Sequence, residues 1–429
     1  MSTPRDLTHP AERIVRAMER IYRYRMTTTS GGNLSIRDEN GDIWITPARV
    51  DKGALRREDI ICVKADGTVE GRHPPSSEFP FHRGIYARRP DVKAVIHAHP
   101  VALVAFSISG KIPDTALFAK ARQVCGKVGF APYALPGSEK LGDLIAGVFA
   151  KGFQCVMLEN HGVVVAGGDL DQAFSRFETL EFTAKTVIKA QALGEVQYLT
   201  EEQLLLASQR QPSFGVFAPG AADSRERALR QELCEFVRRG YHQRLLISTE
   251  GSFSTRLGVD EFLITGRMVD RANLRPDQLV LVRAGAVEQD GEPSHAAELH
   301  RAIYRAHPKI NAIINATPVN ATAFAVSDSV LDTRTIPESY IFLRDVGKLP
   351  FCEVYAAPQT VAKRMHDEFP VALIENDGAL VLGRTILDAF DRLEVLESTA
   401  EAVINGRALG PVKSMKPAVI DELIEAFLK

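Results

Sequence analysis

Residues 82–109 read HRGIYARRPDVKAVIHAHPVALVAFSIS, and residues 300–327 read HRAIYRAHPKINAIINATPVNATAFAVS. Two further pairs of stretches keep the same order and spacing: IWITPARVDKGALRREDII at 43–61 with FLITGRMVDRANLRPDQLV at 262–280, and VMLENHGVVVAGGDLDQAF at 156–174 with ALIENDGALVLGRTILDAF at 372–390. Solenoid repeats have periods of about 20 to 50 residues, whereas this period is about 200 residues. The sequence therefore predicts two copies of one whole domain.

The join between the copies is expected in PSFGVFAPGAADSRE at 212–226, which is rich in proline, glycine and alanine and lacks hydrophobic periodicity. We therefore predict a first domain over residues 1–215 and a second over residues 216–429. Each copy mixes helical and strand patterns, which indicates an α/β class with helices on both faces of a sheet. Hairpin signals such as Asn40-Gly41 indicate antiparallel pairing. The expected fold is two tandem three-layer α/β/α sandwiches, each around a largely antiparallel, mixed sheet.

The composition is that of an ordinary globular protein, with 45% hydrophobic and 25% charged residues. The 52 basic and 54 acidic residues give a formal net charge of −2, so no global attraction to nucleic acid or to a membrane surface is expected. The five cysteines are widely spaced without a C-x-x-C pair, which is typical of free thiols in a reducing compartment. Because neither a secretory leader nor an apolar run of about 20 residues is found, the sequence predicts a cytoplasmic protein without a membrane span.

The first copy contains four residues that suit a divalent metal ion. His97 and His99 stand at the end of a predicted strand, where alternation points both imidazoles to one side. His161 lies on a tight turn between two predicted strands, and Glu78 opens a predicted helix. Three imidazoles and a carboxylate are typical of a catalytic metal site that keeps room for substrate. Taken alone, an H-x-H pair is more often two ordinary histidines, so the pattern needs a control.

The duplication supplies that control. At the four matching positions, the second copy carries Asn315, Thr317, Asp377 and Ala296. Histidines that only the fold requires would be expected in both copies. Their joint loss indicates that the four residues form one functional unit, which the second copy does not maintain. By the same test His82 and His300, which match each other, are expected to be structural.

Five stretches of the first copy carry a family resemblance: Gly31-Gly32-Asn33-Leu34-Ser35, Ile45-Thr46-Pro47, Pro75-Ser76-Ser77-Glu78, His97-Ala98-His99-Pro100 and Glu159-Asn160-His161-Gly162. In this order, and over the whole of the first copy, they resemble the class II aldolase/adducin family, which includes sugar-phosphate aldolases and epimerases. The second copy resembles the same fold without its metal ligands. The resemblance is specific because it rests on several motifs in the family's order.

The resemblance implies that His97, His99 and His161 bind a divalent ion, usually zinc (Zn2+), although such ligands also accept manganese, iron or cobalt (Mn2+, Fe2+ or Co2+). Glu78 falls where the family's aldolases carry their acid/base glutamate and its epimerases carry aspartate, which favours an aldolase. Four residues match the family's phosphate pocket: Asn33, Thr46, Ser76 and Ser77. Hydroxyls, an amide and N–H groups near a helix start suit a phosphate dianion. Lys52 lies near these segments in sequence, and a solvated face is expected for it.

One feature of the family's fuculose-phosphate aldolases is missing from the first copy. Those enzymes use tyrosines, one of them from a neighbouring subunit, to assist proton transfer at the aldehyde end. The matching residues here are Phe118 and Phe214, and neither can donate a proton. The second copy has Tyr340 at or next to the corresponding place. We therefore predict that Tyr340 is lent across an interface, in a homodimer of tandem chains that forms a pseudo-fourfold ring; a packed aromatic without this role is the alternative.

The resemblance implies a metal-dependent lyase acting on a small sugar phosphate. The first interpretation is an aldolase that cleaves a ketose 1-phosphate, similar to L-fuculose-1-phosphate, into dihydroxyacetone phosphate and an aldehyde. A methylthioribulose-1-phosphate dehydratase and a sugar-acid-phosphate decarboxylase of the same family stay open, because the fold alone does not choose among them. A non-catalytic, adducin-like scaffold is the alternative from another class, and the second copy by itself resembles it.

Overall fold

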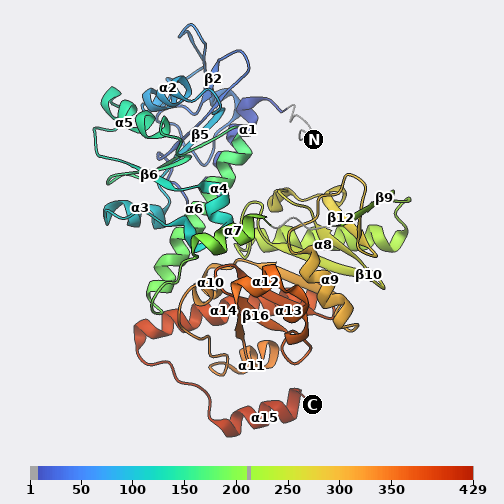
Figure 1. The fold of residues 1–429 in the computed structure, drawn as a ribbon. Helices are drawn as coiled ribbons and strands as arrows, with labels where there is room; N and C mark the ends of the chain where they lie inside the picture. Colours follow the sequence, from blue (N-terminus) through green and yellow to red (C-terminus); the bar gives the residue numbers. More distant parts are fainter. Residues whose placement is uncertain (1–7, 210–213, 429) are drawn as a thin grey trace. The chain divides into compact units, whose positions relative to one another are not determined.

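The computed structural model describes residues 8–209 and 214–428. This part of the chain forms two compact units. One unit ends at Lys185 and omits residues 116–119; the other consists of those four residues and the chain that follows Lys185. Each unit mixes helices and strands around one sheet (Figure 1). The two tandem α/β domains predicted from the sequence are therefore present, while the domain boundary near residue 215 stays a prediction.

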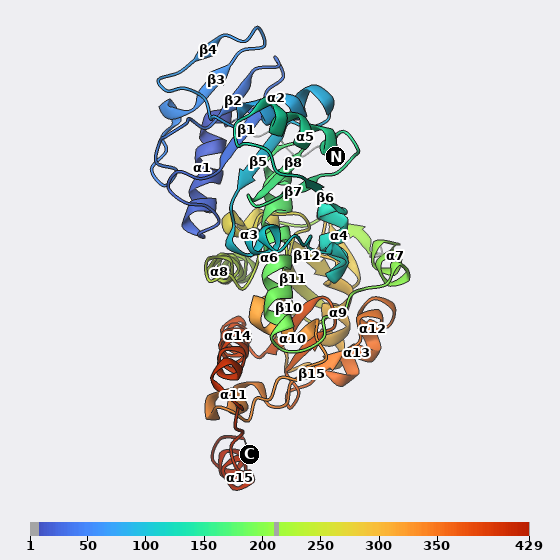
Figure 2. The same ribbon diagram turned by 90° about the vertical axis from the view of Figure 1, so that its left-hand side faces the viewer.

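The first unit contains an eight-stranded sheet in the order β4-β3-β2-β1-β5-β8-β7-β6, which can be followed in Figure 2. Neighbouring strands pair antiparallel, except for β6 and β7, which pair in parallel. The elements in chain order are α1 (Pro10–Arg23), β1 (Asn33–Arg37), β2 (Ile43–Ile45), η1 (Arg57–Asp59), β3 (Ile61–Val63), β4 (Val69–Glu70), α2 (Phe79–Arg88), β5 (Ala94–Ala98), α3 (Val101–Ile108), η2 (Thr115–Leu117), α4 (Ala119–Cys125), β6 (Val128–Ala131), α5 (Glu139–Phe149), β7 (Cys155–Leu158), β8 (Val163–Gly167) and α6 (Leu170–Gln191).

Two apolar clusters hold helices against opposite faces of this sheet. Ile14 of α1 and Phe177 of α6 pack in one cluster with Ile96 of β5. Phe81 of α2 packs in the other cluster with Val95, the neighbour of Ile96 on the same strand. Adjacent residues of a strand point to opposite faces, so the two clusters lie on the two sides of the sheet. This is the three-layer α/β/α arrangement that the sequence predicts.

The second unit contains a nine-stranded sheet in the order β15-β16-β17-β14-β10-β11-β12-β13-β9. Its first eight strands repeat the order of the first sheet, read from β6 to β4, and the additional strand β9 pairs in parallel with β13. β15 pairs in parallel with β16, as β6 does with β7. The register is also repeated, because Asn33 lies opposite His97 in one unit and Ser252 lies opposite Asn315 in the other. Equal strand order and register confirm that the two copies share one fold.

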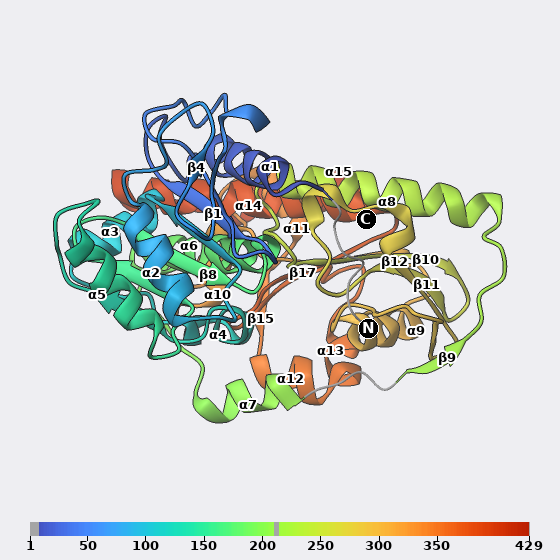
Figure 3. The same cartoon turned by 90° about the horizontal axis from the view of Figure 1, so that it is seen from above.

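Helices cover both faces of the second sheet as well. Figure 3 shows α8 on one side of β10, β11 and β12, and α9 and α13 on the other. None of the helices in the described ranges has the length and apolar character that crossing a membrane requires. The elements after α6 are α7 (Glu201–Gln209), β9 (Gly215–Phe217), α8 (Ser224–His242), β10 (Ser252–Gly258), β11 (Glu261–Thr265), η3 (Arg271–Asn273), η4 (Pro276–Gln278), β12 (Leu279–Arg283), β13 (Ala286–Glu288), α9 (Ala297–Ala306), β14 (Ala312–Ala316), α10 (Val319–Ala325), α11 (Pro337–Leu343), β15 (Gly347–Leu349), α12 (Phe351–Ala356), α13 (Pro358–Arg364), β16 (Val371–Ile374), β17 (Gly378–Gly383), α14 (Ile386–Leu409) and α15 (Pro417–Phe427).

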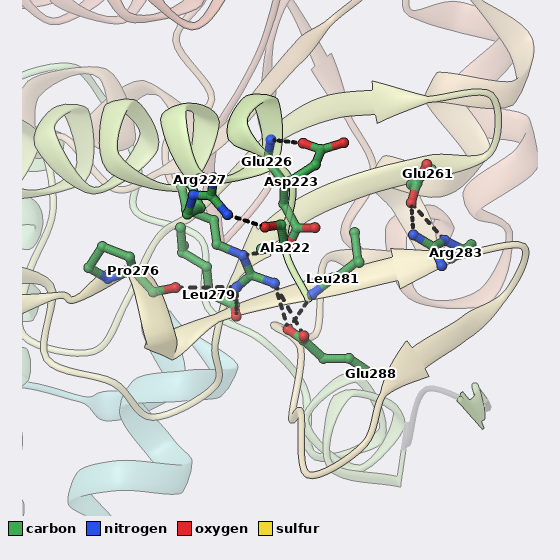
Figure 4. Close-up of polar contacts among 11 residues, drawn as sticks. Ala222, Asp223, Glu226, Arg227, Glu261, Pro276, Leu279, Leu281, Arg283 and Glu288 are labelled. Carbon is green, nitrogen blue, oxygen red and sulfur yellow. Dashed lines mark hydrogen bonds and ion pairs between the residues drawn. The ribbon is translucent and has the colours of Figure 1, made fainter. Parts of the chain in front are cut away.

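A shielded polar cluster attaches α8 to the sheet of the second unit. The guanidinium of Arg230 donates to the carbonyl of Leu279 at 2.7 Å and pairs with the Glu226 carboxylate at 2.8 Å. It also pairs with Glu288 at 3.2 Å, and Glu288 accepts the backbone N–H of Leu281 at 2.7 Å (Figure 4). The side chain of Arg230 is only 12% exposed, so water competes little for these interactions. The cluster therefore fixes the start of α8 against β12 and β13.

Candidate metal centre and active site

Strand β5 carries the first two histidines of the predicted site. His97 is paired with Asn33 of β1 on one side and with Val164 of β8 on the other. His99 follows immediately after the strand, before α3 begins. Because residues two apart along a strand point the same way, both imidazoles lie on the side of the sheet that α2 covers. The alternation predicted from the sequence is confirmed.

His161 lies on the turn between β7 and β8. The preceding residue, Asn160, has a φ angle of 52°, in the left-handed region that asparagine and glycine tolerate best. The following residue, Gly162, passes so close to β5 that a Cβ atom there would lie 2.6 Å from the carbonyl oxygen of Ala98. The Asn-His-Gly sequence therefore has a geometric reason: it lets the turn approach β5 and brings the His161 ring beside the other two.

The three imidazoles converge. One ring nitrogen of each histidine lies within 4.8 Å of those of the others, and the Nε2 atoms of His97 and His99 are 3.0 Å apart. Nδ1 of His97 donates to the carbonyl of Val163 at 2.9 Å, which holds the ring and directs Nε2 into the cluster. Within the described ranges, no other group of three or more His, Cys, Asp or Glu side chains comes together in this way.

Glu78 joins the cluster from the start of α2. Its Oε2 atom lies 3.2 Å from Nε2 of His97, and its Oε1 atom lies 3.6 Å from Nε2 of His161. Oε2 also accepts a hydrogen bond from Nδ2 of Asn33 at 2.8 Å, whereas the buried Oε1 has no hydrogen-bond donor among the described residues. A buried carboxylate oxygen beside three imidazoles is the environment that a cation satisfies. The residues present therefore fit a divalent metal ion.

The charges of this cluster depend on one another. Burial lowers the pKa of His99 to about 3 and that of His161 to about 4, and the neighbouring His97 adds to both effects. Burial opposes the charged forms of Glu78 and His97 too, but their mutual attraction outweighs it, so the pKa of Glu78 falls and that of His97 rises. His99 and His161 are therefore neutral near pH 7, which is the protonation state that metal ligation requires.

Three of the four residues predicted for a phosphate pocket lie together beside Glu78. Asn33 is 3% exposed, and Thr46, at the end of β2, is fully buried. The carbonyl of Thr46 accepts the backbone N–H of Ser76 at 3.1 Å, and the hydroxyl of Ser76 accepts the backbone N–H of Glu78 at 3.3 Å. Ser77 is the exposed member of the set. The structure thus connects the end of β2 to the start of α2, and the binding of phosphate there stays a prediction.

The expectation of a solvated face for Lys52 is wrong. Its side chain is only 3% exposed, and Nζ donates to the carbonyl of Pro47 at 2.6 Å. Burial lowers its pKa to about 8. The matching residue of the second copy, Arg271, is 2% exposed and donates to three backbone carbonyls. A basic residue at both matching positions was the sequence signal that could have indicated a buried cation here.

The aromatic residues predicted for the aldehyde end all belong to the second unit. Phe118 is 5% exposed, and Phe214 packs against the apolar cluster around β12, α9 and α13. Tyr340 is 8% exposed on α11, with the guanidinium carbon of Arg334 lying 5.9 Å from its ring centre. The histidine cluster belongs to the first unit, so the lending of Tyr340 between chains stays a prediction.

The second copy keeps the strand and the turn of the site but carries different side chains at the positions of the three histidines. Asn315, in the place of the first strand histidine, accepts a hydrogen bond from His300 at 2.7 Å. Asp377 has its pKa raised to about 6, by burial first and then by the charge of Glu250. Asn376 repeats the φ angle of 52° found at the matching turn of the first copy. The turn and the strand are therefore retained, while the imidazoles that would hold a metal are replaced.

Comparison with known proteins agrees with the duplication. The sequence model described as the class II aldolase and adducin N-terminal domain matches residues 12–188 and again residues 231–404. A 3-oxo-tetronate 4-phosphate decarboxylase of Haemophilus influenzae is 32% identical over 197 residues, which are 45% of this chain and 93% of the relative. A 5-deoxy-D-ribulose 1-phosphate aldolase of Bacillus thuringiensis is 30% identical over 45% of this chain and 91% of the relative.

An L-fuculose phosphate aldolase of Haemophilus influenzae is also similar, at 29% identity over 44% of this chain and 86% of the relative. Each of these relatives thus corresponds to less than half of the present chain, as a duplicated protein requires. Because the family model matches both halves, and both halves have the same sheet order, the chain belongs to the class II aldolase and adducin family, with one family domain in each copy.

Proposed function

We propose that the first copy is a metal-dependent lyase that forms and protonates the enediolate of dihydroxyacetone phosphate. The observation that carries this proposal is a buried glutamate, Glu78, whose carboxylate contacts two of three converging imidazoles, those of His97 and His161. The reactions named for the relatives have this intermediate in common by their chemistry. Cleavage of a ketose 1-phosphate between C3 and C4, and loss of carbon dioxide from 3-oxo-tetronate 4-phosphate, both leave dihydroxyacetone phosphate.

His97, His99 and His161 would hold the ion, which we expect to be zinc, with manganese, iron or cobalt as alternatives. When bound, such an ion supplies Lewis-acid stabilisation to substrate oxygens that become negative. Glu78 transfers the proton at the hydroxymethyl carbon, accepting it in one direction and returning it in the other. Its Oε1 atom is suited to this task because Oε2 is held by Asn33, whereas Oε1 has no donor among the described residues.

The phosphate is assigned to the start of α2, with four groups as ligands: the side chains of Asn33, Thr46, Ser76 and Ser77. Hydroxyls and N–H groups at a helix start favour a dianion. Lys52 adds a positive charge beside the same segment. Its ammonium donates one hydrogen bond, to the carbonyl of Pro47, so its other two N–H groups can donate to a phosphate. Anchoring the phosphate would hold the reacting carbon beside Glu78. The free energy of phosphate binding then compensates the entropy lost in orienting the substrate, which lowers the activation barrier for proton transfer.

For the bond that breaks, we favour an aldolase acting on a ketose 1-phosphate similar to L-fuculose-1-phosphate. This reaction must also remove a proton from the C4 hydroxyl, and we assign that step to Tyr340 of a partner chain in a homodimer with pseudo-fourfold symmetry. Tyr340→Phe is then expected to slow aldehyde release about 100-fold while proton exchange at the other product is kept. An unchanged rate of aldehyde release would remove Tyr340 from the mechanism.

A sugar-acid-phosphate decarboxylase is the second candidate. Phe118 and Phe214 occupy the positions where phenols would serve the aldehyde end, and loss of carbon dioxide needs no proton acceptor there. The two candidates separate by product, because one releases an aldehyde from ketose 1-phosphates and the other releases carbon dioxide from 3-oxo-tetronate 4-phosphate. Dihydroxyacetone phosphate accompanies both, so the second product must be measured.

Solvent exchange tests the proposal before the substrate is known. The full chain, loaded with zinc, is incubated with dihydroxyacetone phosphate in D2O, and loss of the hydroxymethyl proton signal is followed by NMR. We expect exchange by the natural protein and a rate about 100- to 10,000-fold lower for Glu78→Gln at equal zinc content. A protein that binds about one zinc ion per chain but exchanges no proton would contradict the proposal. A protein that binds no metal would instead favour the adducin-like scaffold.

A further inference from the structure

A chain of buried polar groups ends on the Glu78 carboxylate. Oη of Tyr86 lies 2.7 Å from Oγ of Ser35, which lies 2.6 Å from Nδ1 of His82. Nε2 of His82 lies 2.5 Å from Oδ1 of Asn33, whose Nδ2 donates to Glu78 at 2.8 Å. Ser35 and His82 are fully buried, and Tyr86 and Asn33 are 3% exposed. Water therefore has little access to any link of the chain.

The direction of each hydrogen bond follows from the carboxylate end. Glu78 only accepts, so the amide nitrogen of Asn33 donates and its Oδ1 accepts from His82. His82 therefore carries a proton on Nε2; burial lowers its pKa to about 3, so the ring is neutral and Nδ1 accepts. The hydroxyl of Ser35 donates a hydrogen bond to Nδ1, and the oxygen of Ser35 accepts one from the hydroxyl of Tyr86. A single tautomer of His82 thus orients the amide that holds the carboxylate.

The second copy contains the same histidine, but its chain ends elsewhere. Oη of Tyr304 lies 2.7 Å from Oγ of Ser254, which lies 2.7 Å from Nδ1 of His300. Nε2 of His300 then meets Oδ1 of Asn315 at 2.7 Å, in the place of the first strand histidine of the metal cluster. Within the part of the chain that the structure describes, no carboxylate accepts from Asn315, and Ala296 takes the place of the glutamate. The shared part of the chain is therefore scaffold, and the part beyond it differs between the copies.

We propose that His82 is a positioning residue for Glu78. Through Asn33 it fixes Oε2 of the carboxylate and leaves Oε1 to transfer the proton, a role that His300 does not have. This inference rests on the proposed function, since it specifies how the acid/base group is held. It also revises the expectation that a histidine present in both copies is only structural: the residue is shared, whereas the group at the end of its chain is not.

Matched substitutions in the two copies test the proposal. His82→Leu removes both ring contacts, while His82→Gln keeps a donor for Asn33; His300→Leu and His300→Gln make the same changes in the second copy. Proton exchange into dihydroxyacetone phosphate is measured over a range of concentrations with the zinc-loaded full chain. We expect His82→Leu to lower kcat about 10- to 100-fold, the range that one charge-assisted hydrogen bond spans. Zinc content is expected to stay within about twofold.

The glutamine variant separates positioning from packing. His82→Gln is expected to recover most of kcat, and both His300 variants are expected to match the natural protein. Equal losses of kcat in the His82 and His300 variants would show a general effect on stability and would overturn the proposal. An unchanged kcat in His82→Leu would overturn it as well.

A crystal structure of His82→Leu gives a readout that needs no activity. We expect Nδ2 of Asn33 and Oε2 of Glu78 to separate beyond about 3.5 Å, the limit of a hydrogen bond. If the natural protein exchanges no proton, the proposed function fails, and this distance still decides the positioning role. An intact contact between Asn33 and Glu78 would refute that role.

Should His82→Leu not fold, Ser35→Ala compared with Ser254→Ala carries the same test. Ser35→Ala deletes the donor to Nδ1 of His82 and leaves the ring free to change tautomer. We expect a loss of at least about threefold in kcat for Ser35→Ala only, which is the effect of weakening one hydrogen bond. Equal kcat values for the two alanine variants would contradict the proposal.

Discussion

Replacing Lys52 by methionine tests whether the first copy keeps a buried cation at a cost to its own stability. Lys52 is 3% exposed, and its ammonium donates to Pro47 and has no ion-pair partner within the described ranges. In the second copy, the guanidinium of Arg271 is satisfied by three backbone carbonyls. Methionine has a similar shape without charge. We therefore expect Lys52→Met to stabilise the first copy, whereas Arg271→Met destabilises the second.

The magnitude follows from the pKa of the buried amine. Burial lowers the pKa of Lys52 to about 8, against about 10.4 in an unfolded chain. At about 1.4 kcal/mol per pKa unit, the protonated amine costs the folded state about 3 kcal/mol at pH 7. Loss of the hydrogen bond to Pro47 offsets about 1 kcal/mol of this, so the expected net gain is about 2 kcal/mol.

The pH dependence gives the sign of the effect. Below about pH 8 both states of the natural protein hold the proton on Lys52, and the penalty is constant. Between about pH 8 and 10.4 only the unfolded state holds it, so the stability of the natural protein rises with pH. The advantage of Lys52→Met should therefore decline above pH 8 and disappear by about pH 10.

The single tryptophan makes the assay specific to the first copy. Trp44 lies in β2, where its Nε1 donates to Asp38 at 3.0 Å, so its fluorescence reports unfolding of this unit. Urea titrations at pH 7 and pH 10 give the free energies of unfolding. Inorganic phosphate at pH 7 is expected to stabilise the natural protein more than Lys52→Met. A variant that is less stable at pH 7, or whose advantage is the same at both pH values, would refute the reasoning.

Gly162→Ala places a Cβ against the backbone of β5, so zinc bound per chain is expected to fall in metal analysis, whereas the equally crowded Gly378→Ala of the second copy should leave it unchanged. Arg230→Met is expected to lower the free energy of unfolding of the second copy by about 3 kcal/mol in circular-dichroism titrations. The exposed ion pair of Arg283, also drawn in Figure 4, should contribute less than about 1 kcal/mol. Burial raises the pKa of Asp377 to about 6, so ionisation increasingly penalises the folded state between about pH 4 and pH 6. Asp377→Asn should therefore stabilise the second copy by about 3 kcal/mol at pH 7 and have almost no effect at about pH 3.

The position of His97 and His99 could be predicted from the sequence, and so could the turn that carries His161, because local rules determine both. Strand alternation directs His97 and His99 to one face, and an asparagine and a glycine around His161 specify a tight turn. The second copy has Asn315, Thr317 and Asp377 at the three matching positions, which indicates that these histidines are not required by the fold. The convergence of His161 and Glu78 on His97 and His99 depends on the pairing of β5 with β8 and on the packing of α2, and the sequence indicated it only through the family resemblance.

Two features of the site could not be predicted, for physical reasons. The amide of Asn33 is directed to Glu78 across 45 residues of sequence, and only the packed positions of β1 and α2 determine that contact. Lys52 lies in a stretch of charged residues, where a solvated side chain is the ordinary outcome. Its burial depends on the segment around Pro47, whose carbonyl receives the ammonium.

Matching residues of the two copies share a role only where their contacts, and not merely their identities, agree. Glu181 and Glu397 are buried at matching positions, and both accept backbone N–H groups at the start of the helix that follows the central strand, from Leu103 and Ala321 respectively. These equal residues share their backbone partners and therefore a structural role, and only their side-chain partners differ, Lys185 for Glu181 and Asn320 for Glu397.

His82 and His300 are the same residue with different partners. The hydrogen-bond chain through His82 ends on the Glu78 carboxylate, whereas the chain through His300 ends on the Asn315 amide. By this criterion the first copy contains a connected set that the second copy lacks: the three imidazoles, Glu78, Asn33 and His82, which donates to Asn33. Substitutions that abolish chemistry without unfolding the protein should therefore concentrate in this set, and matching substitutions in the second copy should change stability alone.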